Sequence, residues 1–485
     1  MKRLYCMAAL ALAATLPAMA QDTGDDSRRF TAERVFDLEY ATSPRISPDG
    51  SKIVYVRHSM DIRKDQDRGD LWIIDVKTGQ QRPLVNGGSS ASSPVWSPDG
   101  TRLLYTTSND GKPELRLLYL DSGDSFSLAQ LEEGASGAEW SPNGEMIAFS
   151  MFVAEDKPSF ATPIDQPEGA EWNEPVKVYD DLTFRFDGAG YLEDGYDQIF
   201  VLSADGGSPR QITDDEGGFS PPVWLDDDTL LASGNLDEDR DMQPVESEIY
   251  AIELSDQSVR PLTSRVGPDY GPVVSPDGET IAFRGYDDEV MAYQQANLYL
   301  MDADGSNVRE LAADLDREFG QVEWAQNGRS LYSLIENAGN MDVFEIGMNG
   351  ATSIAITGLG GTSIGRPYAG ADFSVSDTNR PVFAYTAGSP NTPSEVAVAG
   401  RNVDDRVLTA LNADVIPYLD MASIEEIKVS SSADGREIEA WVALPPDFTA
   451  DGSFPMILEI HGGPFAMYGP FFAAEIQRYA AEGYV

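Results

Sequence analysis

The chain has 485 residues, 41% of them hydrophobic, and a formal net charge of −47 at pH 7. This length and composition allow two or more cores, although one large β-propeller would take up most of the chain. The negative charge argues against nucleic acid and anionic membranes as partners, because both need a basic face. Either solubility in a salty environment or attraction of cationic peptides and amino termini would explain it.

Residues 1–20 have the pattern of a secretory signal. Lys2 and Arg3 precede an apolar stretch at 7–16, and the small residues 18–20 form a cleavage site before Gln21. The alternative is a buried N-terminal helix. The apolar stretch is too short to span a bilayer, and no later stretch suggests membrane insertion of the mature chain. The only cysteine, Cys6, would leave with the signal, which favours a periplasmic or secreted protein without disulfides.

An N-terminal segment with a short helix is expected at 21–39, and a repeated turn begins after it. Ser47-Pro48-Asp49-Gly50 has six further full or degenerate copies, at residues 97–100, 141–144, 225–228, 275–278, 325–328 and 374–377. All intervals are 44–50 residues long except one of 84. Pro and Asp-Gly favour tight turns, so this residue choice predicts a connection between strands.

The sequence around each turn predicts β-strands. Several copies follow a tryptophan, namely Trp96, Trp140, Trp224 and Trp324. Alternating apolar stretches come after the turns, for example at 52–56 and 280–283, and a second strand then ends in an acidic turn. A period near 45–50 residues with four short strands per unit is typical of propeller blades. The sequence therefore predicts a seven-bladed β-propeller over residues 40–420.

The one long interval carries an insertion at 151–197 that mixes aromatic and acidic side chains. Its aromatic residues are Trp172, Tyr179, Phe184, Phe186, Tyr191 and Tyr196. One interpretation is an extended hairpin that covers the edge of a blade. The other is a flap that lines the access route of a substrate or forms an oligomer contact.

From residue 423 the periodicity changes. We expect strands at 425–431, 437–444 and 455–460, a helix at 471–482 and the start of another strand at 484. This order predicts the N-terminal part of an α/β-hydrolase domain at 423–485, after an all-β seven-bladed β-propeller. Such a domain needs roughly 200 residues, so the chain is expected to stop inside it. A partial sheet exposes apolar edges, which predicts poor order or aggregation of this part alone.

A His-Gly-Gly-Pro turn follows the third expected strand. His461, Gly462, Gly463 and Pro464 are candidates for an oxyanion-binding region, in which backbone N–H groups of Gly462, Gly463 or a neighbour stabilise a developing negative charge. His461 would brace the loop without transferring protons. The alternative is a tight turn whose glycines only permit positive φ. Tyr468 would either lend a hydroxyl to this site or pack at the start of the helix.

Together these features resemble the prolyl oligopeptidase family of serine peptidases, in particular its acylaminoacyl-peptidase-like branch. The segment Phe30-Thr31-Ala32-Glu33-Arg34-Val35-Phe36 and residues 179–188 of the insertion are similar to that branch as well. The resemblance implies a Ser-His-Asp mechanism on oligopeptides, with the propeller restricting access. It also implies a Gly-x-Ser-x-Gly-Gly elbow after the oxyanion strand, hence beyond residue 485, so we expect no catalytic triad and no activity in this chain alone.

Other candidates for chemistry are weaker. Residues 361–365 match a nucleophile elbow around Ser363, yet Pro367 follows where a helix should begin, and the motif precedes the oxyanion strand. His58 is expected in a blade loop and is no credible base. The acidic turn at 302–307 lacks the closing glutamate of a calcium loop, so no metal or other cofactor is expected.

Three hypotheses for function remain. The first is the N-terminal part of an exported serine peptidase. The second is a non-catalytic periplasmic propeller of the TolB type that binds proteins, because such propellers share the repeated turn. The third, a carboxylesterase or lipase, shares the Gly-Gly turn but normally lacks a propeller. An oligomer is possible under each of them.

Overall fold

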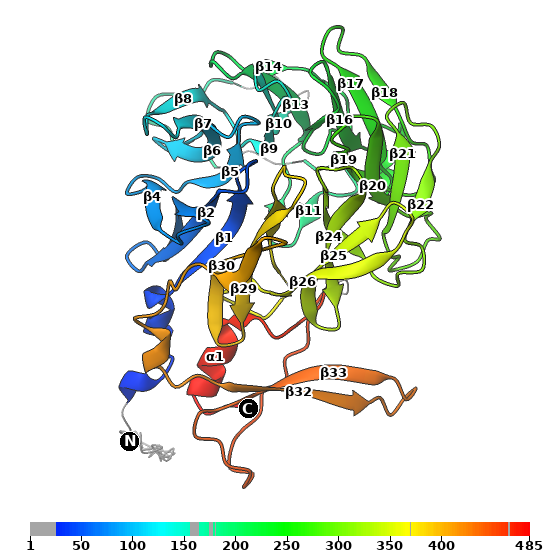
Figure 1. Ribbon diagram of the computed structural model, residues 1–485. Helices are drawn as coiled ribbons and strands as arrows, with labels where there is room; N and C mark the ends of the chain where they lie inside the picture. The colour runs from blue at the N-terminus through cyan, green and yellow to red at the C-terminus, as the bar shows by residue number, and fades with distance from the viewer. Residues whose placement is uncertain (1–25, 156–163, 174–177, 180, 369, 464–465) are drawn as a thin grey trace, which may run out of the picture.

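The computed structural model describes residues 26–155, 164–173, 178–179, 181–368, 370–463 and 466–485. The expected signal at 1–20, parts of the insertion and Pro464 lie outside these residues. Most of the described strands form antiparallel sheets arranged around a central axis, as in a β-propeller (Figure 1). A segment made of a long hairpin and one helix lies next to this ring.

The ring contains five separate four-stranded sheets. The first has β1 (Glu39–Ile46), β2 (Lys52–Asp61), β3 (Gln66–Asp75) and β4 (Gln81–Val85). The second has β5 (Ser92–Trp96), β6 (Arg102–Asn109), β7 (Lys112–Tyr119) and β8 (Ser125–Gln130). The third has β9 (Ser136–Trp140), β10 (Met146–Ala154), β13 (Gly195–Ser203) and β14 (Arg210–Gln211). The fourth has β15 (Val223–Trp224), β16 (Thr229–Gly234), β17 (Glu248–Glu253) and β18 (Val259–Pro261). The fifth has β19 (Asp269–Val274), β20 (Thr280–Gly285), β21 (Asn297–Asp302) and β22 (Arg309–Leu311).

The remaining ring strands belong to one eight-stranded sheet. Its first group is β23 (Phe319–Trp324), β24 (Ser330–Asn337), β25 (Asn340–Gly347) and β26 (Thr352–Leu359). Its second group is β28 (Phe373–Val375), β29 (Val382–Ser389), β30 (Thr392–Gly400) and β31 (Val403–Val407). A single residue pair, Leu359 with Ala387, joins the two groups.

The ends of the ring meet without sharing a strand. All strands of the first sheet come from the N-terminal end, and β28–β31 all come from the C-terminal end. Side chains connect them: Ser394 Oγ donates to the Ala41 carbonyl at 2.7 Å, and Ser374 Oγ donates to the Pro44 carbonyl at 2.9 Å. These buried hydrogen bonds close the ring in place of a shared sheet.

The repeated turn is stabilised by its own side chains. In the first copy, Ser47 Oγ donates to Asp49 Oδ1 at 2.6 Å and accepts a hydrogen bond from the Lys52 N–H at 3.0 Å. Gly50 has a φ of +73°, which favours glycine. The same Ser–Asp hydrogen bond forms at 2.6 Å in the copies that begin at Ser97 and Ser275. Ser47, Asp49 and Gly50 thus each stabilise the turn in a different way.

The tryptophans before the turns connect neighbouring sheets. In each case the indole N–H donates to a backbone carbonyl of the preceding sheet in the ring, in the pairs Trp96–Arg45 (2.9 Å), Trp140–Val95 (3.4 Å), Trp224–Glu139 (3.3 Å) and Trp324–Val273 (3.1 Å). The acceptor lies on the first strand of that sheet. The recurrence of tryptophan is therefore a packing feature that holds the sheets together.

Two glutamates occupy equivalent positions. Each belongs to the first strand of a group of four strands, and its carboxylate bonds to the first strand of the next group in the ring. Glu139 directly precedes Trp140, and Glu323 directly precedes Trp324. Glu323 Oε2 accepts the backbone N–H of Val375 at 3.0 Å. Burial raises the pKa of each carboxyl to about 7. A hydrogen bond from the backbone of Trp224 offsets part of this effect at Glu139, and the charge of Arg45 with a hydrogen bond from the backbone of Val375 offsets part of it at Glu323.

These raised pKa values predict a pH-dependent stability. The folded chain binds the two protons more tightly than the unfolded chain, whose glutamates titrate near 4.5. The stabilisation is therefore complete below about pH 4.5 and is lost as the pH rises through about 7. We expect Glu139→Gln and Glu323→Gln each to increase the free energy of unfolding by about 1–2 kcal/mol at about pH 8 and to change it little at about pH 5. Urea titrations at both pH values measure this, and equal gains at both would contradict it.

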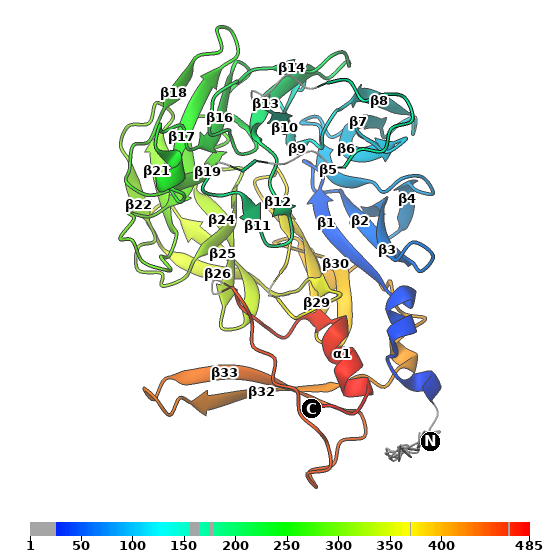
Figure 2. The ribbon, with the colours of Figure 1, turned by 180° about the vertical axis from the view of Figure 1, so that it is seen from behind.

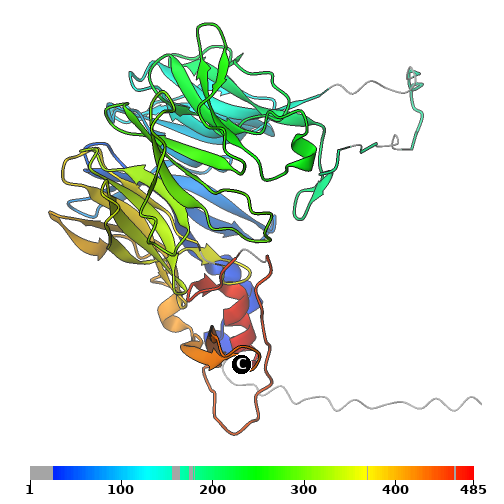
Figure 3. The same ribbon diagram turned by 90° about the vertical axis from the view of Figure 1, so that its right-hand side faces the viewer.

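The two edges of the ring carry different connections. The Ser-Pro-Asp-Gly turns link the first and second strand of a sheet and lie on one edge. Because neighbouring strands are antiparallel, the loops from second to third strand and from one sheet to the next lie on the opposite edge. The insertion between β10 and β13 belongs to that opposite edge. Its hairpin, β11 (Arg185–Phe186) with β12 (Gly190–Tyr191), lies apart from the four-stranded sheets (Figure 3).

Residues 423–485 contain a hairpin, a short strand and a helix. These are β32 (Ser423–Ser430), β33 (Glu437–Leu444), β34 (Phe472–Ala473) and α1 (Ala474–Ala481). The short 3₁₀ helices η1 (Asp26–Arg28), η2 (Ala32–Asp37), η3 (Arg240–Met242) and η4 (Ile416–Tyr418) lie outside the sheets. In the described part of the chain, no helix has the length and apolar character needed to cross a membrane.

Three predictions for this segment are wrong. Residues 455–460 are extended but form no strand, and the helix begins at Ala474, three residues later than expected. The expected strand at 484 does not form either. The Ile457 N–H donates to the Val485 carbonyl at 2.8 Å, and the Val485 N–H donates to the Pro455 carbonyl at 2.9 Å. Two such bonds align the segments without building a ladder. The residues before Ala474 pair as β34 with β27 (Thr362–Ser363), so they cannot join the helix.

The C-terminal segment is docked on the edge of the ring that carries the loops from second to third strand and from one sheet to the next. We call this the loop-bearing edge. Gln477 of α1 is only 2% exposed, and its amide donates to the Pro390 carbonyl and to Asn391 Oδ1, both at 2.8 Å. Phe472 packs edge-to-face on Phe30 with ring centres 6.2 Å apart. Figure 2 shows α1 beside the N-terminal helices and below β29 and β30. The hairpin adds a contact, because Trp441 lies directly against Gly339 in the turn between β24 and β25.

Candidate functional site

The predicted oxyanion turn lies at the surface of the C-terminal segment. His461, Gly462 and Gly463 follow the extended residues 455–460 and are all exposed. Gly463 has a φ of +138°, a conformation that other residues rarely adopt. His461 Nδ1 lies 3.1 Å from the Gly462 carbonyl. Pro464 is outside the described residues, so three of the four predicted positions are placed here, in one continuous turn.

Side chains from the propeller reach this turn. The linker between β26 and β28 brings Arg366 to Glu459, with Arg366 Nε 3.0 Å from Glu459 Oε1. The Gly462 N–H donates to the Tyr368 hydroxyl at 3.4 Å. Sequence analysis missed both residues. The sequence signal that could have found them is the placement of an Arg and a Tyr on either side of Pro367 in a glycine-rich linker. This combination indicates a segment held by contacts more than a flexible spacer.

Tyr468 joins the two parts. Its ring lies edge-on to Tyr368, with centres 4.9 Å apart, and edge-on to His461 at 5.6 Å. Its hydroxyl donates to Glu459 Oε1 at 3.3 Å. Burial raises the pKa of Tyr468 to about 12, and the hydrogen bond with Tyr368 and the charge of Glu459 add to this. Tyr468 therefore stays protonated and directs its hydroxyl to Glu459.

The predicted oxyanion role of the turn depends on its backbone N–H groups. With the Gly462 N–H bonded to Tyr368, the Gly463 N–H is the next backbone donor along the turn. Two converging N–H groups stabilise a tetrahedral intermediate, and the residue after a serine nucleophile normally supplies the second. Among the residues described at the turn, none is a serine, threonine or cysteine that could act as a nucleophile.

The elbow-like motif around Ser363 has a different structure from a nucleophile elbow. Thr362 and Ser363 form β27, which runs parallel to β34 of the C-terminal segment. Thr362 Oγ1 lies 2.9 Å from Ser394 Oγ of the last ring sheet. A nucleophile elbow instead leads from a strand directly into a helix. The motif here connects the propeller to the C-terminal segment.

The prediction that His58 lies in a blade loop is wrong. His58 belongs to β2, because β2 and β3 extend to Asp61 and Gln66 as one long hairpin. Its Nε2 lies 2.9 Å from Thr42 Oγ1 and its Nδ1 lies 2.7 Å from Asp67 Oδ2, and its ring stacks on Tyr40. Burial lowers the pKa of His58 despite Asp67. This network connects three strands of one sheet.

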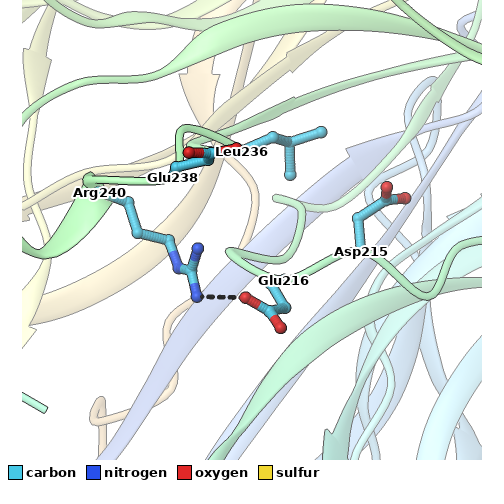
Figure 4. A pocket seen from close by; sticks show the side chains of 5 residues that line it. All are labelled: Asp215, Glu216, Leu236, Glu238 and Arg240. Carbon is cyan, nitrogen blue, oxygen red and sulfur yellow. Dashed lines mark hydrogen bonds and ion pairs between the residues drawn. The ribbon is translucent and has the colours of Figure 1, made fainter.

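An acidic cavity of about 350 Å³ opens on the loop-bearing edge of the ring (Figure 4). Its lining residues are Asp215, Glu216, Leu236, Glu238 and Arg240. Arg240 forms an ion pair with Glu216 at 2.8 Å and also donates to the Tyr196 hydroxyl at 3.0 Å. Burial and the neighbouring Asp214 raise the pKa of Asp215. The cavity lies on the same edge as the docked C-terminal segment, but in sheets three and four of the ring.

In the part of the chain that the structure describes, no three His, Cys, Asp or Glu side chains gather as metal ligands. The acidic turn at 302–307 is held by its own hydrogen bonds. Asn307 Nδ2 donates to Asp302 Oδ2 at 2.6 Å, and the Ser306 N–H donates to Asp304 Oδ1 at 2.9 Å.

Comparisons with known proteins agree with this architecture. Residues 26–158 match the family described as TolB beta propeller domain. The chain is 26% identical over 472 residues to a protein of Bacillus subtilis named uncharacterized peptidase YuxL, covering 94% of this chain and 69% of the relative. It is 22% identical to dipeptidyl-peptidase 5 of Porphyromonas gingivalis, covering 100% of this chain and 71% of the relative.

The fold is also similar to that of a solved peptidase. The acylaminoacyl peptidase of Pyrococcus horikoshii superposes with a TM-score of 0.74 at 18% identity, over 94% of this chain and 66% of that protein. At this identity the superposition shows the fold alone. The chain spans about two thirds of the length of each of these proteins. The relatives named as peptidases confirm the resemblance that the motifs indicated: the chain is similar to peptidases of the prolyl oligopeptidase family, and its residues 26–158 match a TolB-type β-propeller.

Proposed function

We propose that this chain is the propeller and the first part of the α/β-hydrolase domain of an exported serine peptidase that hydrolyses oligopeptides. One observation carries the proposal: an exposed Gly-Gly turn follows an apolar segment, and a propeller linker contacts this turn. Relatives named peptidases align with nearly all of the chain, which supports the same reading. A Ser-His-Asp triad beyond residue 485 would supply the nucleophile and the base.

The exposed apolar surface of the C-terminal segment supports an unfinished sheet. Met456, Leu458 and Ile460 are 71–72% exposed, and Val429 and Ile438 of the hairpin are about half exposed. Apolar stretches of this kind normally form strands inside a sheet. Such a strand has neighbouring strands along both edges and helices over both faces of the sheet. A complete hydrolase domain would cover them, and the relatives are long enough to contain one.

The propeller in this proposal has seven blades and gates access to the active site. Counting the eight-stranded sheet as two blades gives seven groups of four strands. The acidic cavity and the insertion lie on the edge that carries the hydrolase segment, where a peptide would pass. Signal-like residues 1–20 would direct the protein to the periplasm or the exterior, and oligopeptides are the expected partners.

Covalent labelling by a fluorophosphonate probe tests the proposal. The protein extended to its nucleophile elbow should be labelled at a serine of that elbow, whereas the 485-residue chain should remain unlabelled. Ser363→Ala is the control and should leave labelling of the extended protein unchanged. Labelling of the 485-residue chain, or loss of labelling in Ser363→Ala, would contradict the assignment.

A binding module is the second candidate, because the TolB-type family match covers residues 26–158. Such a module would bind protein partners through the loop-bearing edge and perform no chemistry. The gene distinguishes the two: an open frame that continues into a Gly-x-Ser-x-Gly-Gly elbow supports the peptidase, and a stop after codon 485 supports the module. An esterase or lipase remains a weaker third candidate, because the propeller is unusual for it.

A further inference from the structure

We propose that the propeller linker Arg366-Pro367-Tyr368 positions the oxyanion turn, with Arg366 and Tyr368 as positioning residues of the peptidase. The inference rests on the proposed function, since the turn acts on a substrate only in a peptidase. It gives the propeller a role in catalysis in addition to gating. Three sets of contacts carry it: the backbone pairing of the linker, the ion pair of Arg366 and the contacts of Tyr368.

The backbone fixes the register between the linker and the C-terminal segment. β27 pairs in parallel with β34, and the Gly469 N–H donates to the Pro367 carbonyl at 3.2 Å. Tyr368 and Tyr468 form an isolated antiparallel bridge. Pairing on both sides of residues 364–367 prevents the linker from sliding along the C-terminal segment. The side chains of Arg366 and Tyr368 are therefore presented at defined places.

Arg366 acts on the segment that enters the turn. Its ion pair with Glu459 lies two residues before His461, and Tyr468 donates to the same carboxylate oxygen from the other side. The Arg366 side chain is 49% exposed and that of Glu459 is 24% exposed. Exposed ion pairs add little to global stability. The consequence of this pair is thus local: it sets where residue 459 lies relative to the propeller.

Tyr368 acts on the turn itself. Its hydroxyl accepts the Gly462 N–H, and its ring contacts Tyr468. A peptide unit is planar, so holding the Gly462 N–H also fixes the carbonyl of His461. The φ and ψ dihedrals of Gly462 alone then direct the Gly463 N–H relative to this fixed peptide unit. A donor aimed in advance stabilises an oxyanion without reorganisation during the reaction.

A direct substrate contact is the competing role for these side chains, because Tyr368 is 40% exposed. The two roles differ in kinetics. A positioning residue changes transition-state stabilisation and hence kcat, whereas a residue that only holds the peptide changes KM. The variants below separate them.

The test uses the complete peptidase, extended through its nucleophile. Tyr368→Phe, which removes one hydroxyl, and Arg366→Gln should each lower kcat about tenfold and leave KM within about twofold. Glu459→Gln should resemble Arg366→Gln, and the double variant should be no worse than either one, because both remove the same contact. Arg366→Lys should recover most of the activity. Tyr418→Phe, at a tyrosine that is 67% exposed in η4, is the matched control.

A second measurement needs no activity. In the 485-residue chain, Tyr368→Phe should accelerate hydrogen exchange of the Gly462 amide about fivefold or more and leave amides of β2 unchanged. If the wild-type peptidase is inactive and unlabelled by the fluorophosphonate probe, the proposed function fails, and the catalytic consequence fails with it. If the wild type is active and the variants change only KM, or leave kcat within about twofold, this inference alone is overturned.

Discussion

Replacing Trp96 by alanine should destabilise the propeller by about 3–5 kcal/mol, the cost typical of removing a large aromatic side chain from a core. The indole is 9% exposed and packs among buried residues of the first and second sheets. Its N–H also donates to the Arg45 carbonyl across the boundary between these sheets. The variant would thus create a cavity and leave a carbonyl without its donor at one boundary. Trp96→Phe retains most of the volume and should cost about 1–2 kcal/mol, mainly through the lost hydrogen bond.

Chemical denaturation followed by circular dichroism measures both variants. Trp172→Ala is the matched control, since this tryptophan is 49% exposed in the insertion and should change the free energy of unfolding by less than about 0.5 kcal/mol. A loss in Trp96→Ala no larger than in Trp172→Ala would show that the boundary between sheets does not depend on the indole. An equal loss in Trp96→Phe and Trp96→Ala would assign the whole effect to the hydrogen bond.

The repeated interactions of the turns and tryptophans explain why the ring could be predicted from the sequence. Ser47, Asp49 and Gly50 each perform a local task in the turn, and the same task recurs wherever the motif does. A tryptophan before the turn bonds to the previous sheet in all four cases. Repeats of local interactions leave a periodic trace in the sequence, so strands and their order could be predicted.

The C-terminal segment was predicted less well because its structure depends on partners distant in sequence. An apolar stretch such as 455–460 indicates a strand only if neighbouring strands are present, and here its backbone bonds only with Val485 among the residues described. The residues at 472–473 are helical by pattern but pair with β27 instead. Such pairings between segments about 110 residues apart leave no local signal.

At the candidate site, too, features that depend on local sequence were predicted and features that depend on distant partners were not. The Gly-Gly turn was found because glycine at positive φ is a local requirement. Arg366 and Tyr368 were missed, since their partners Glu459 and Gly462 lie 93 and 94 residues further along the chain. His58 was misplaced for a related reason: its partners Thr42 and Asp67 are supplied by two other strands of the same sheet.

The docking of the C-terminal segment depends on Gln477, and Gln477→Met should weaken that docking by about 2–4 kcal/mol. Besides its two donor contacts with the loop between β29 and β30, its Oε1 accepts the Ala422 N–H at 2.9 Å. Methionine fills a similar volume but satisfies none of these three polar partners, of which the Ala422 N–H is buried and the two oxygens are partly buried. The loss in free energy should weaken the contact between α1 and the ring, because Gln477 is the residue of α1 that bonds to both Ala422 and Pro390.

Hydrogen exchange distinguishes a local from a global loss. In Gln477→Met, amides of α1 should exchange about 30-fold faster or more, while those of β2 and β24 should keep their protection. Arg478→Gln, on the exposed face of the same helix, should change neither group. A uniform acceleration over ring and helix would mean that the ring needs the docked helix for its own stability. In that case the propeller and the C-terminal segment would unfold as one unit, and a substrate of the proposed peptidase could not be admitted by separating them.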